Sequence, residues 1–315
     1  MKTRNLFWGL FFVTIGILIL LANIGSLNFD MTYIWKFWPV IFILLGISYF
    51  TTNSVVKGFL SAISAIIIAV ALFAFFNSIF WFVRGNDFFD NNHNYSMSSD
   101  FDSSNYSTDY SPDIKKAVFY FDAGAGIFNI KDTTDNLMSA HITGHKNHYQ
   151  LEKEVANGTA TVKFKMKKRS FTFFDGKYNH NYAQIKLNPN PVWDLYLNGG
   201  AAEMDFDLTP YKTDNIKVKM GAAKIRIKLG DRSEQTNLNL NAGVSSIEIL
   251  IPDSSGCQIR VKSALSDNEF NGFDRMNKHE YQTSNFDHAK HKIYLNLDAG
   301  ISSVHVNRYN KSDWQ

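Results

Sequence analysis

The chain has 315 residues, a formal net charge of +3 and one cysteine, with 45% hydrophobic and 19% charged residues. Such a length has room for about two domains, the single cysteine excludes an intrachain disulfide, and so small a positive charge argues against nucleic acid as a partner. The charge is unevenly spread, because residues 1–84 are almost free of it and the rest of the chain is polar.

The apolar N-terminal part predicts a three-span membrane anchor over residues 1–84. Charge-free runs cover residues 6–24 and 58–83, and residues 33–50 carry one lysine, Lys36, near their start. Each run is long enough for a hydrocarbon core of about 30 Å, and Lys36 can snorkel to the interface from its aromatic surroundings. We therefore expect a multi-pass α-helical anchor in a lipid bilayer.

The flanking charges predict an orientation. Lys2 and Arg4 precede the first run and Lys57 precedes the last, which places the N terminus in the cytoplasm and the C-terminal domain outside it. Arg84 goes against this orientation, because it would lie outside the cytoplasm. Small residues at four-residue spacing between residues 58 and 69 suit helix packing, within the anchor or in a homo-oligomer.

Residues 85–112 read as a flexible polar linker. They are rich in Asn, Asp, Ser and Tyr, and their few apolar residues are scattered. Such a stretch cannot bury enough apolar area to offset its ordering entropy, and a flexible chain of this length spans roughly 30 Å on average. We expect it to tether the domain of residues 113–315 with freedom to reorient.

One short pattern recurs five times in residues 113–315. Each copy has two apolar-polar alternating strands around a corner of small residues, and the predicted structural corners are Gly124, Gly200, Gly221, Gly243 and Gly300. The three middle glycines lie 21 and 22 residues apart, a period typical of stacked supersecondary units. No helical pattern follows any corner, which argues against a phosphate cradle. We predict an all-β, β-solenoid-like rack of stacked short strands.

Further strands and loops are expected around these copies. Residues 160–167 alternate like a strand, and residues 256–262 look like another unit that lacks the glycine corner. Residues 169–182 and 263–290 read as long loops or hairpins inserted at the edges of the repeat.

Basic residues take outward positions on successive strands. They are Lys163, Lys165, Lys167, Lys217, Lys219, Lys224, Arg226 and Lys228, continued by Arg260 and Lys262. Stacking could align them into a strip that meets anionic lipid headgroups or an anionic envelope polymer. Glu203, Asp205 and Glu248 hold equivalent positions in neighbouring copies, which favours an ordinary solvated face that protects against aggregation.

No catalytic, cofactor or metal site is predicted. Cys257 shares the parity of buried strand residues, so we expect a core side chain rather than a nucleophile. The pairs His145–His148 and His288–His291 lack acidic or cysteine partners at motif distance. The sequence contains no nucleophile elbow, no His-Glu-x-x-His and no P-loop.

Two segments resemble a known family. Trp8–Phe50, with Gly16–Gly25 and Trp38–Gly46, is similar to the membrane region of LiaI/LiaF-like proteins. Val192–Leu229 resembles the toast-rack domain of LiaF-type proteins and related adhesin-like proteins. The long linker, the large insertions and the third span depart from the simplest pattern of this family.

The resemblance implies a non-enzymatic protein of the bacterial plasma membrane. In the LiaF branch it implies a modulator of an envelope-stress two-component system, with a sensor kinase or another envelope protein as partner. The alternative is a structural or adhesin-like envelope module without a signalling role. The regulatory role is expected only because the fold is similar, and no residues of a functional site in this sequence indicate it.

Overall fold

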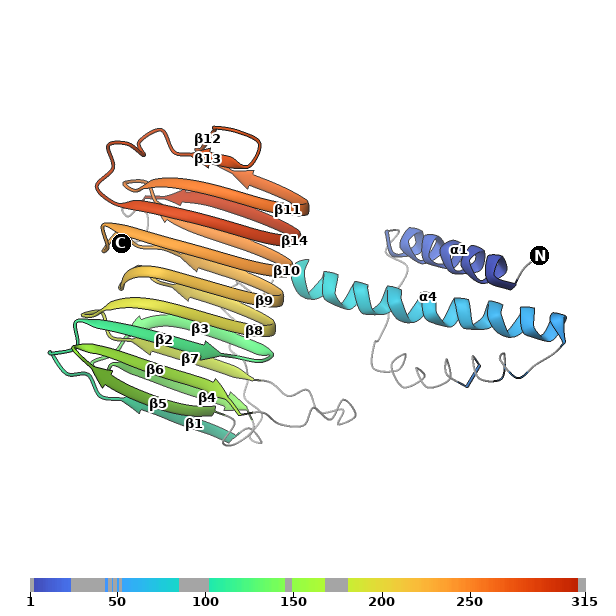
Figure 1. Ribbon diagram of the computed structural model, residues 1–315, viewed down its shortest axis with the longest axis horizontal. Coiled ribbons are helices and arrows are strands. Elements are labelled where there is room, and N and C mark those ends of the chain that lie inside the picture. The colour runs from blue at the N-terminus through green and yellow to red at the C-terminus, as the bar shows by residue number, and fades with distance from the viewer. Residues whose placement is uncertain are drawn as a thin grey trace. The chain divides into compact units, whose positions relative to one another are not determined.

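The computed structural model describes residues 3–23, 43–44, 47, 50, 53–84, 102–144, 149–167 and 181–310. The chain divides into a helical unit, Met1–Asp87, and a β unit, Phe88–Gln315 (Figure 1).

The helical unit contains α1 (Thr3–Asn23) and α4 (Ser54–Arg84), which contact each other. The buried residues of α4 are small: Ser64, Ala65 and Ala69 have no exposed area. The Ser64 hydroxyl donates a 2.9 Å hydrogen bond to the carbonyl of Leu60, so its polar group is satisfied within the helix. Small side chains let helices pack closely in an apolar environment.

The prediction of a multi-pass anchor is wrong for the described residues. They hold two helices, and only α4 contains a segment, Val55–Phe73, that is long and apolar enough to cross a bilayer. The apolar part of α1, Leu6–Leu21, is too short. The uncharged run counted in the sequence, residues 6–24, continues beyond this segment and beyond the end of α1 at Asn23. Most of the expected middle span, residues 33–50, lies outside the described residues.

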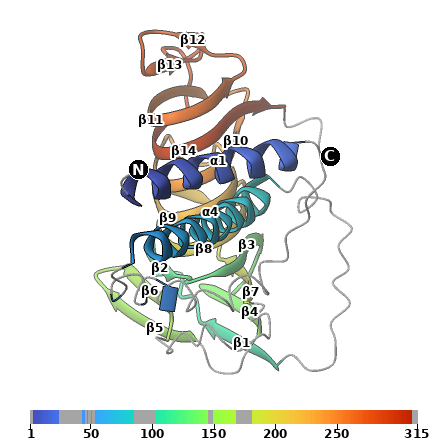
Figure 2. The same ribbon diagram turned by 90° about the vertical axis from the view of Figure 1, so that its right-hand side faces the viewer.

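In its described part, the β unit is one 14-stranded sheet that folds over itself into two layers (Figures 1 and 2). The strands are β1 (Asp102–Thr108), β2 (Lys116–Asp122), β3 (Gly126–Thr133), β4 (Met138–Gly144), β5 (Tyr149–Ala156), β6 (Thr159–Met166), β7 (Tyr182–Leu187), β8 (Val192–Asp207), β9 (Lys212–Lys228), β10 (Gln235–Pro252), β11 (Gly256–Phe270), β12 (Asp274–Arg275), β13 (Glu280–Gln282) and β14 (Lys292–Tyr309).

The long strands β8, β9, β10, β14 and β11 stack in that order and are parallel. The first half of each lies in the first layer, which β2, β6 and β5 extend at one end and β13 and β12 at the other. The second half lies in the second layer, which β3, β7, β4 and β1 extend. Together β2 and β3 make one more unit of the rack, interrupted at its corner.

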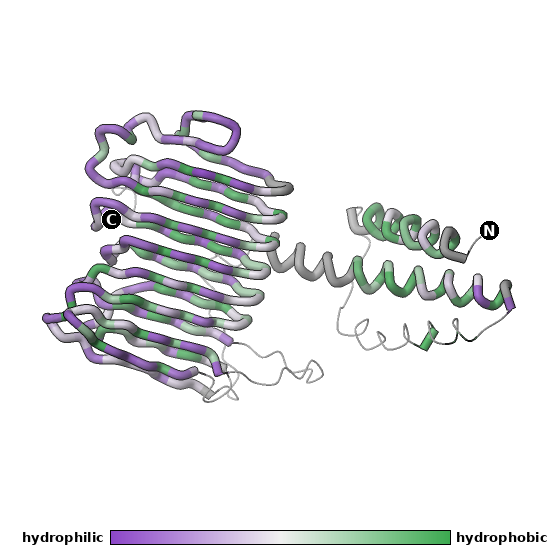
Figure 3. The backbone as a smooth tube through the Cα atoms, viewed as in Figure 1, coloured by the Kyte–Doolittle hydropathy of each residue, from purple (hydrophilic) through white to green (hydrophobic). Residues whose placement is uncertain are grey.

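The core lies between the two layers, and strand β9 shows how the sequence builds it. Ile216 and Val218 are fully buried in its first half, and Ile227 is fully buried in its second half. The alternation shifts by one residue at the corner, so that both halves face inward, and Figure 3 shows the same alternation along every long strand. Each such side chain stabilises the fold by roughly 1.5–3 kcal/mol.

The glycines of the corners lie directly over one another. The Gly200 amide donates a 2.7 Å hydrogen bond to the Gly124 carbonyl. A Cβ on Gly221 would lie 3.0 Å from the Gly200 oxygen, and one on Gly243 or Gly300 would lie 2.6 Å from the oxygen of the preceding glycine. Glycine is therefore favoured at these three positions because backbone approaches backbone there.

Strand β14 is out of sequence order, since it lies between β10 and β11 and pairs with both along most of its length. Strand β11 continues to Phe270, which corrects the expected loop at residues 263–270. It bends without a glycine: Ser263 pairs with Ala299 and Leu265 with Ile301, so Ala264 stands level with Gly300.

Strand β1 lies within the segment predicted as a flexible linker, and that prediction is wrong for residues 102–108. Tyr106 explains the difference, because its ring packs edge-on against Phe164 with centroids 5.2 Å apart and is partly buried against the core. One well-placed aromatic residue and full pairing with β4 order a strand that is otherwise polar. Most of the expected loop at 169–182 and His145–His148 lie outside the described residues.

Candidate functional site

The outward side chains of the two layers form two surfaces, which we call the first face and the second face. The first face comes from residues before the corners and the second face from residues after them. Neighbouring strands are in register, so each outward residue has a partner at the same level on the next strand. Rows of such partners are the units from which both faces are built.

The second face carries a row in which acidic and basic residues alternate across five strands. Its members are Asp205, Arg226, Glu248, His305 and Glu269. Arg226 Nε lies 3.3 Å from Glu248 Oε2, His305 Nδ1 lies 3.8 Å from Glu269 Oε2, and Lys131 Nζ lies 2.5 Å from Asp205 Oδ2. Exposed pairs of this kind contribute about 0.2–1 kcal/mol each. The row therefore contributes little to stability and mainly offsets the charges of the second face against one another.

A second row on this face holds a buried pair of opposite charges. Glu203 and Lys224 are register partners and are only 7% and 6% exposed. Burial raises the pKa of the Glu203 carboxyl, the positive charge of Lys224 opposes that rise, and Asp205 adds to it. Removing one partner would leave the other charge buried without compensation.

The predicted basic residues are divided between surfaces instead of forming one strip. Lys163 and Lys165 lie on β6 at the end of the first layer, level with Tyr120 and Asp122 of β2. Lys163 Nζ is 4.0 Å from Glu154 of β5, and Lys167 follows the end of β6. Lys217 and Lys219 belong to the first face. Lys224, Arg226 and Lys228 belong to the second face, as register partners of Glu203, Asp205 and Asp207.

The first face carries rows of side-chain amides. Asn296 Nδ2 donates to Asn239 Oδ1 at 3.1 Å, and Asn237 Nδ2 donates to Asn215 Oδ1 at 3.3 Å. Asn198 Nδ2 donates to Asp122 Oδ1 at 2.9 Å. These bonds run from strand to strand and hold the amides in a regular array. The array cannot be recognised from the sequence of one repeat copy, because each of its hydrogen bonds joins two neighbouring strands.

Tyr120 and Tyr196 lie beside this array with stacked rings, their centroids 4.8 Å apart and their planes at 16°. Next to them is a shallow depression of about 540 Å³ near the corners. Its lining residues are Asn198, Gly199, Lys219, Met220, Asn241, Ala242, Gly243 and Asp298. The depression is open, and polar and apolar residues line it in equal number, so it suits an extended ligand better than a small enclosed one.

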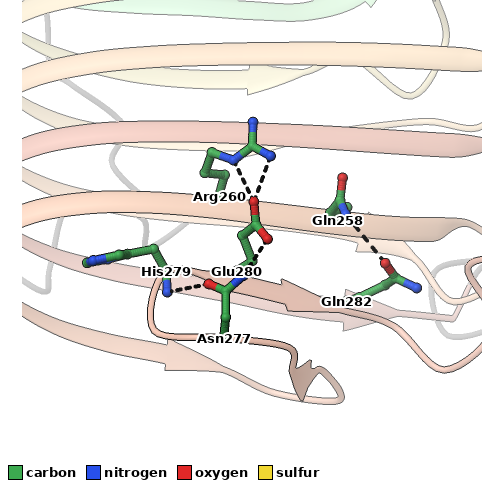
Figure 4. A network of polar contacts seen from close by, with 6 residues as sticks. All are labelled: Gln258, Arg260, Asn277, His279, Glu280 and Gln282. Atoms are coloured by element: carbon green, nitrogen blue, oxygen red, sulfur yellow. Dashed lines mark hydrogen bonds and ion pairs between the residues drawn. The ribbon is translucent and has the colours of Figure 1, made fainter.

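The end of the first layer is closed by a hydrogen-bonded network around Glu280 (Figure 4). Arg260 donates to Glu280 Oε1 from Nε at 2.8 Å and from Nη2 at 2.6 Å, and Asn277 Nδ2 donates to Oε2 at 2.5 Å. Those bonds, first from Arg260 and then from Asn277, lower the pKa of the Glu280 carboxyl. The network is a cap on the edge strand, and it uses the charge of Arg260 internally.

The cysteine and the histidines near the start of β14 offer no reactive site. Cys257 is fully buried, and burial raises the pKa of its thiol, so it is an inert core residue. His291 Nδ1 lies 3.0 Å from the carbonyl of Ser233, whereas His288 is exposed. Within the described ranges, His, Cys, Asp and Glu form no group of three that could hold a metal ion.

Comparison with known proteins shows to which family the chain belongs. Residues 7–85 match the LiaF transmembrane domain. Residues 91–250, just over half of the chain, match the family described as the N-terminal domain of toast_rack, DUF2154. The chain belongs to the toast-rack family. Both segments predicted from the resemblance are confirmed, and the toast-rack protein is anchored in a membrane by a LiaF-type domain.

Two solved structures resemble the toast-rack protein. One is a proposed cell adhesion protein from Clostridium sporogenes, with a TM-score of 0.62, 19% identity, and coverage of 66% of this chain and 100% of that one. The other is a proposed adhesin from Bacteroides fragilis, with a TM-score of 0.25, 9% identity and coverage of 66% and 98%. No curated protein matches the chain. The first structure shows that the rack fold is shared, and none of the matched families is an enzyme family.

Proposed function

We propose that this toast-rack protein is a non-enzymatic accessory protein of the bacterial plasma membrane. Its β unit binds a partner outside the cytoplasm and thereby modulates envelope-stress signalling. The observation that carries the proposal is the contrast between the two faces. The second face compensates its charges internally, whereas the first face offers exposed lysines and amides in a regular array. A surface of that kind suits recognition rather than catalysis.

A position of the β unit outside the cytoplasm is supported by its cysteine usage and by its structural relative. The one thiol, that of Cys257, is fully buried, which protects it in an oxidising compartment. The similar structure from Clostridium sporogenes is described as a cell adhesion protein, and adhesion takes place at the cell surface.

The location is tested with one new thiol, by Lys278→Cys in a Cys257→Ser background. Lys278 is exposed in the β unit. A membrane-impermeant maleimide should label this variant in intact cells, or in spheroplasts where there is an outer membrane. Labelling only after lysis would place the β unit in the cytoplasm and overturn this part of the proposal.

The signalling role also requires a protein partner that contacts a surface other than the first face, for which we propose a sensor kinase or another envelope protein. Deleting the gene should change the output of an envelope-stress reporter, and the full chain should restore it. The matched control is a chain in which Lys278 and Lys290, exposed residues outside the strands, are changed to Gln, and it should restore the output as the parent chain does. An unchanged reporter under several envelope stresses would refute the signalling role.

A second candidate is an adhesive or structural envelope module, which the TM-score of 0.62 to the cell adhesion protein favours. Under this alternative, deletion reduces surface attachment or mechanical integrity and leaves the reporter unchanged. The two functions are therefore separated by one pair of assays on the same deletion strain.

A further inference from the structure

We propose that the first face binds an anionic, polyhydroxylated polymer, meaning a glycan chain that carries carboxylate or phosphate groups. The binding surface, which we call the amide–lysine face, consists of Tyr196, Asn198, Lys217, Lys219, Asn239 and Asn241. This proposal deepens the proposed function and rests on it, because such polymers meet the β unit only outside the cytoplasm.

The two lysines of this face have uncharged neighbours on the adjacent strands. Lys217 has Tyr196 and Asn239 as register partners, and Lys219 has Asn198 and Asn241. Both side chains are exposed, and within the described part of the chain neither ammonium has a carboxylate within 4.0 Å. Two adjacent exposed cations without local compensation attract an anionic ligand.

The side-chain amides of this face have hydrogen-bonding capacity left over for a ligand. Each asparagine offers two donor hydrogens and two acceptor lone pairs. The contact from Asn296 Nδ2 to Asn239 Oδ1, at 3.1 Å, uses one acceptor position of Asn239. Its amide hydrogens remain available, and Asn241 is exposed to solvent. Sugar hydroxyls both donate and accept, so they match this mixed capacity in a way that a purely anionic chain does not.

The spacing of the side chains across the strands suits an extended polymer. Parallel strands place equivalent residues about 4.8 Å apart, so a chain crossing the strands meets one amide or lysine per strand. The depression of about 540 Å³ continues this path over the corners, where Gly199 and Gly243 leave space. Asp298 lines its far end and would repel the anionic groups there, which directs them toward Lys217 and Lys219.

A membrane surface or a protein fits this face less well. Binding of either normally uses exposed apolar side chains, inserted among lipids or packed in the centre of an interface. The large hydrophobic residues exposed on the described β unit are Val155, Met276 and Ile301, and none belongs to the amide–lysine face.

The test measures binding of full-length protein in nanodiscs of phosphatidylcholine, a lipid without net charge. The probes are polygalacturonate, with charge and hydroxyls, dextran, with hydroxyls alone, and polyphosphate, with charge alone. Anionic phosphatidylglycerol vesicles form a fourth arm. The variants are Lys217→Gln/Lys219→Gln and, as a control with the same loss of charge, Lys278→Gln/Lys290→Gln.

Polygalacturonate should bind best, and its affinity should fall with added salt. The Lys217→Gln/Lys219→Gln variant should lose about tenfold in affinity, while the control variant and the thermal unfolding midpoint stay unchanged. The proposal is overturned if both variants lose affinity equally, if polyphosphate binds as well as polygalacturonate, or if only the vesicles bind. Failure of binding together with an altered stress reporter would remove this inference and leave the proposed function standing.

Discussion

Strand β9 crosses both faces of the rack, and its two halves show how register partners decide what a lysine does. Before the corner, Lys217 and Lys219 stand beside tyrosine and asparagine. After it, Lys224 and Lys228 stand beside Glu203 and Asp207. Both halves have the same apolar-polar alternation. The difference comes entirely from the neighbouring strands, so one half serves stability and the other is left available for binding.

The corner separates the two faces, and its disruption should have the largest effect. Gly243→Ala should destabilise the β unit by about 3 kcal/mol, because its Cβ would lie 2.6 Å from the Gly221 carbonyl oxygen and the backbone must shift. Gly200→Ala is the matched control, since its Cβ would lie 3.4 Å from the nearest atom, an ordinary contact. Calorimetry of the full-length protein in neutral detergent measures both. Equal unfolding midpoints for the two variants would show that the glycine column does not hold the layers together.

A pair of substitutions on β9 sharpens the comparison of the faces. Lys224→Met should destabilise the β unit by about 1–3 kcal/mol, because it leaves the buried Glu203 carboxylate without its compensating charge. Lys217→Met makes the same chemical change on the exposed first face and should cost less than about 0.5 kcal/mol. Chemical denaturation in neutral detergent reports the difference. If Lys217→Met proves the more destabilising of the two, the assignment of the faces is reversed.

The smallest expected effect is an opposite pH response of two carboxyl groups. Burial raises the pKa of Glu203 above its ordinary value of 4.5, so its contribution to stability is fully present below pH 4.5 and is lost as pH rises through the raised pKa. Hydrogen bonds lower the pKa of Glu280 below 4.5, so its contribution is present above pH 4.5 and is lost as pH falls through the lowered pKa.

The unfolding midpoint of each variant, relative to the parent chain, should therefore change with pH in a different range: above pH 4.5 for Glu203→Gln and below pH 4.5 for Glu280→Gln. Relative to the parent chain, Glu203→Gln should gain stability as pH rises above 4.5. Glu280→Gln should be less stable than the parent above pH 4.5, and the gap should close in more acidic solution. Parallel pH profiles for both variants would contradict the different environments assigned to the two groups.

The repeat made much of the rack predictable. Alternation identified the inward residues of β9, and the spacing of Gly200, Gly221 and Gly243 indicated stacked units whose register the structure shows. A single basic strip is predicted only if each long strand keeps the same alternation of inward and outward residues along its whole length. The structure shows that this alternation shifts at the corner. The corner between Lys219 and Lys224 sends them to different faces, and the glycines that signal this bend were already visible.

Other features depend on long-range contacts that local patterns do not encode. Strand β14 resembles the central copies, but nothing in its own residues says that it pairs between β10 and β11. Strand β1 has almost no hydrophobic signal and is ordered by pairing with β4 and by Tyr106. The sequence predicts too many membrane spans for the described residues, because a run without charges is a weaker criterion than a long apolar helix.

Lysine reactivity tests the contrast between the faces most directly. The full-length protein in nanodiscs of phosphatidylcholine is acetylated with an N-hydroxysuccinimide ester, with and without polygalacturonate, and each site is followed by peptide mass spectrometry. Without polymer, Lys217 and Lys219 should react faster than Lys224, which is only 6% exposed. With polymer, Lys217 and Lys219 should become protected while Lys278 and Lys290 keep their rates. Unchanged rates at Lys217 and Lys219, or protection that appears at Lys224 instead, would contradict the account.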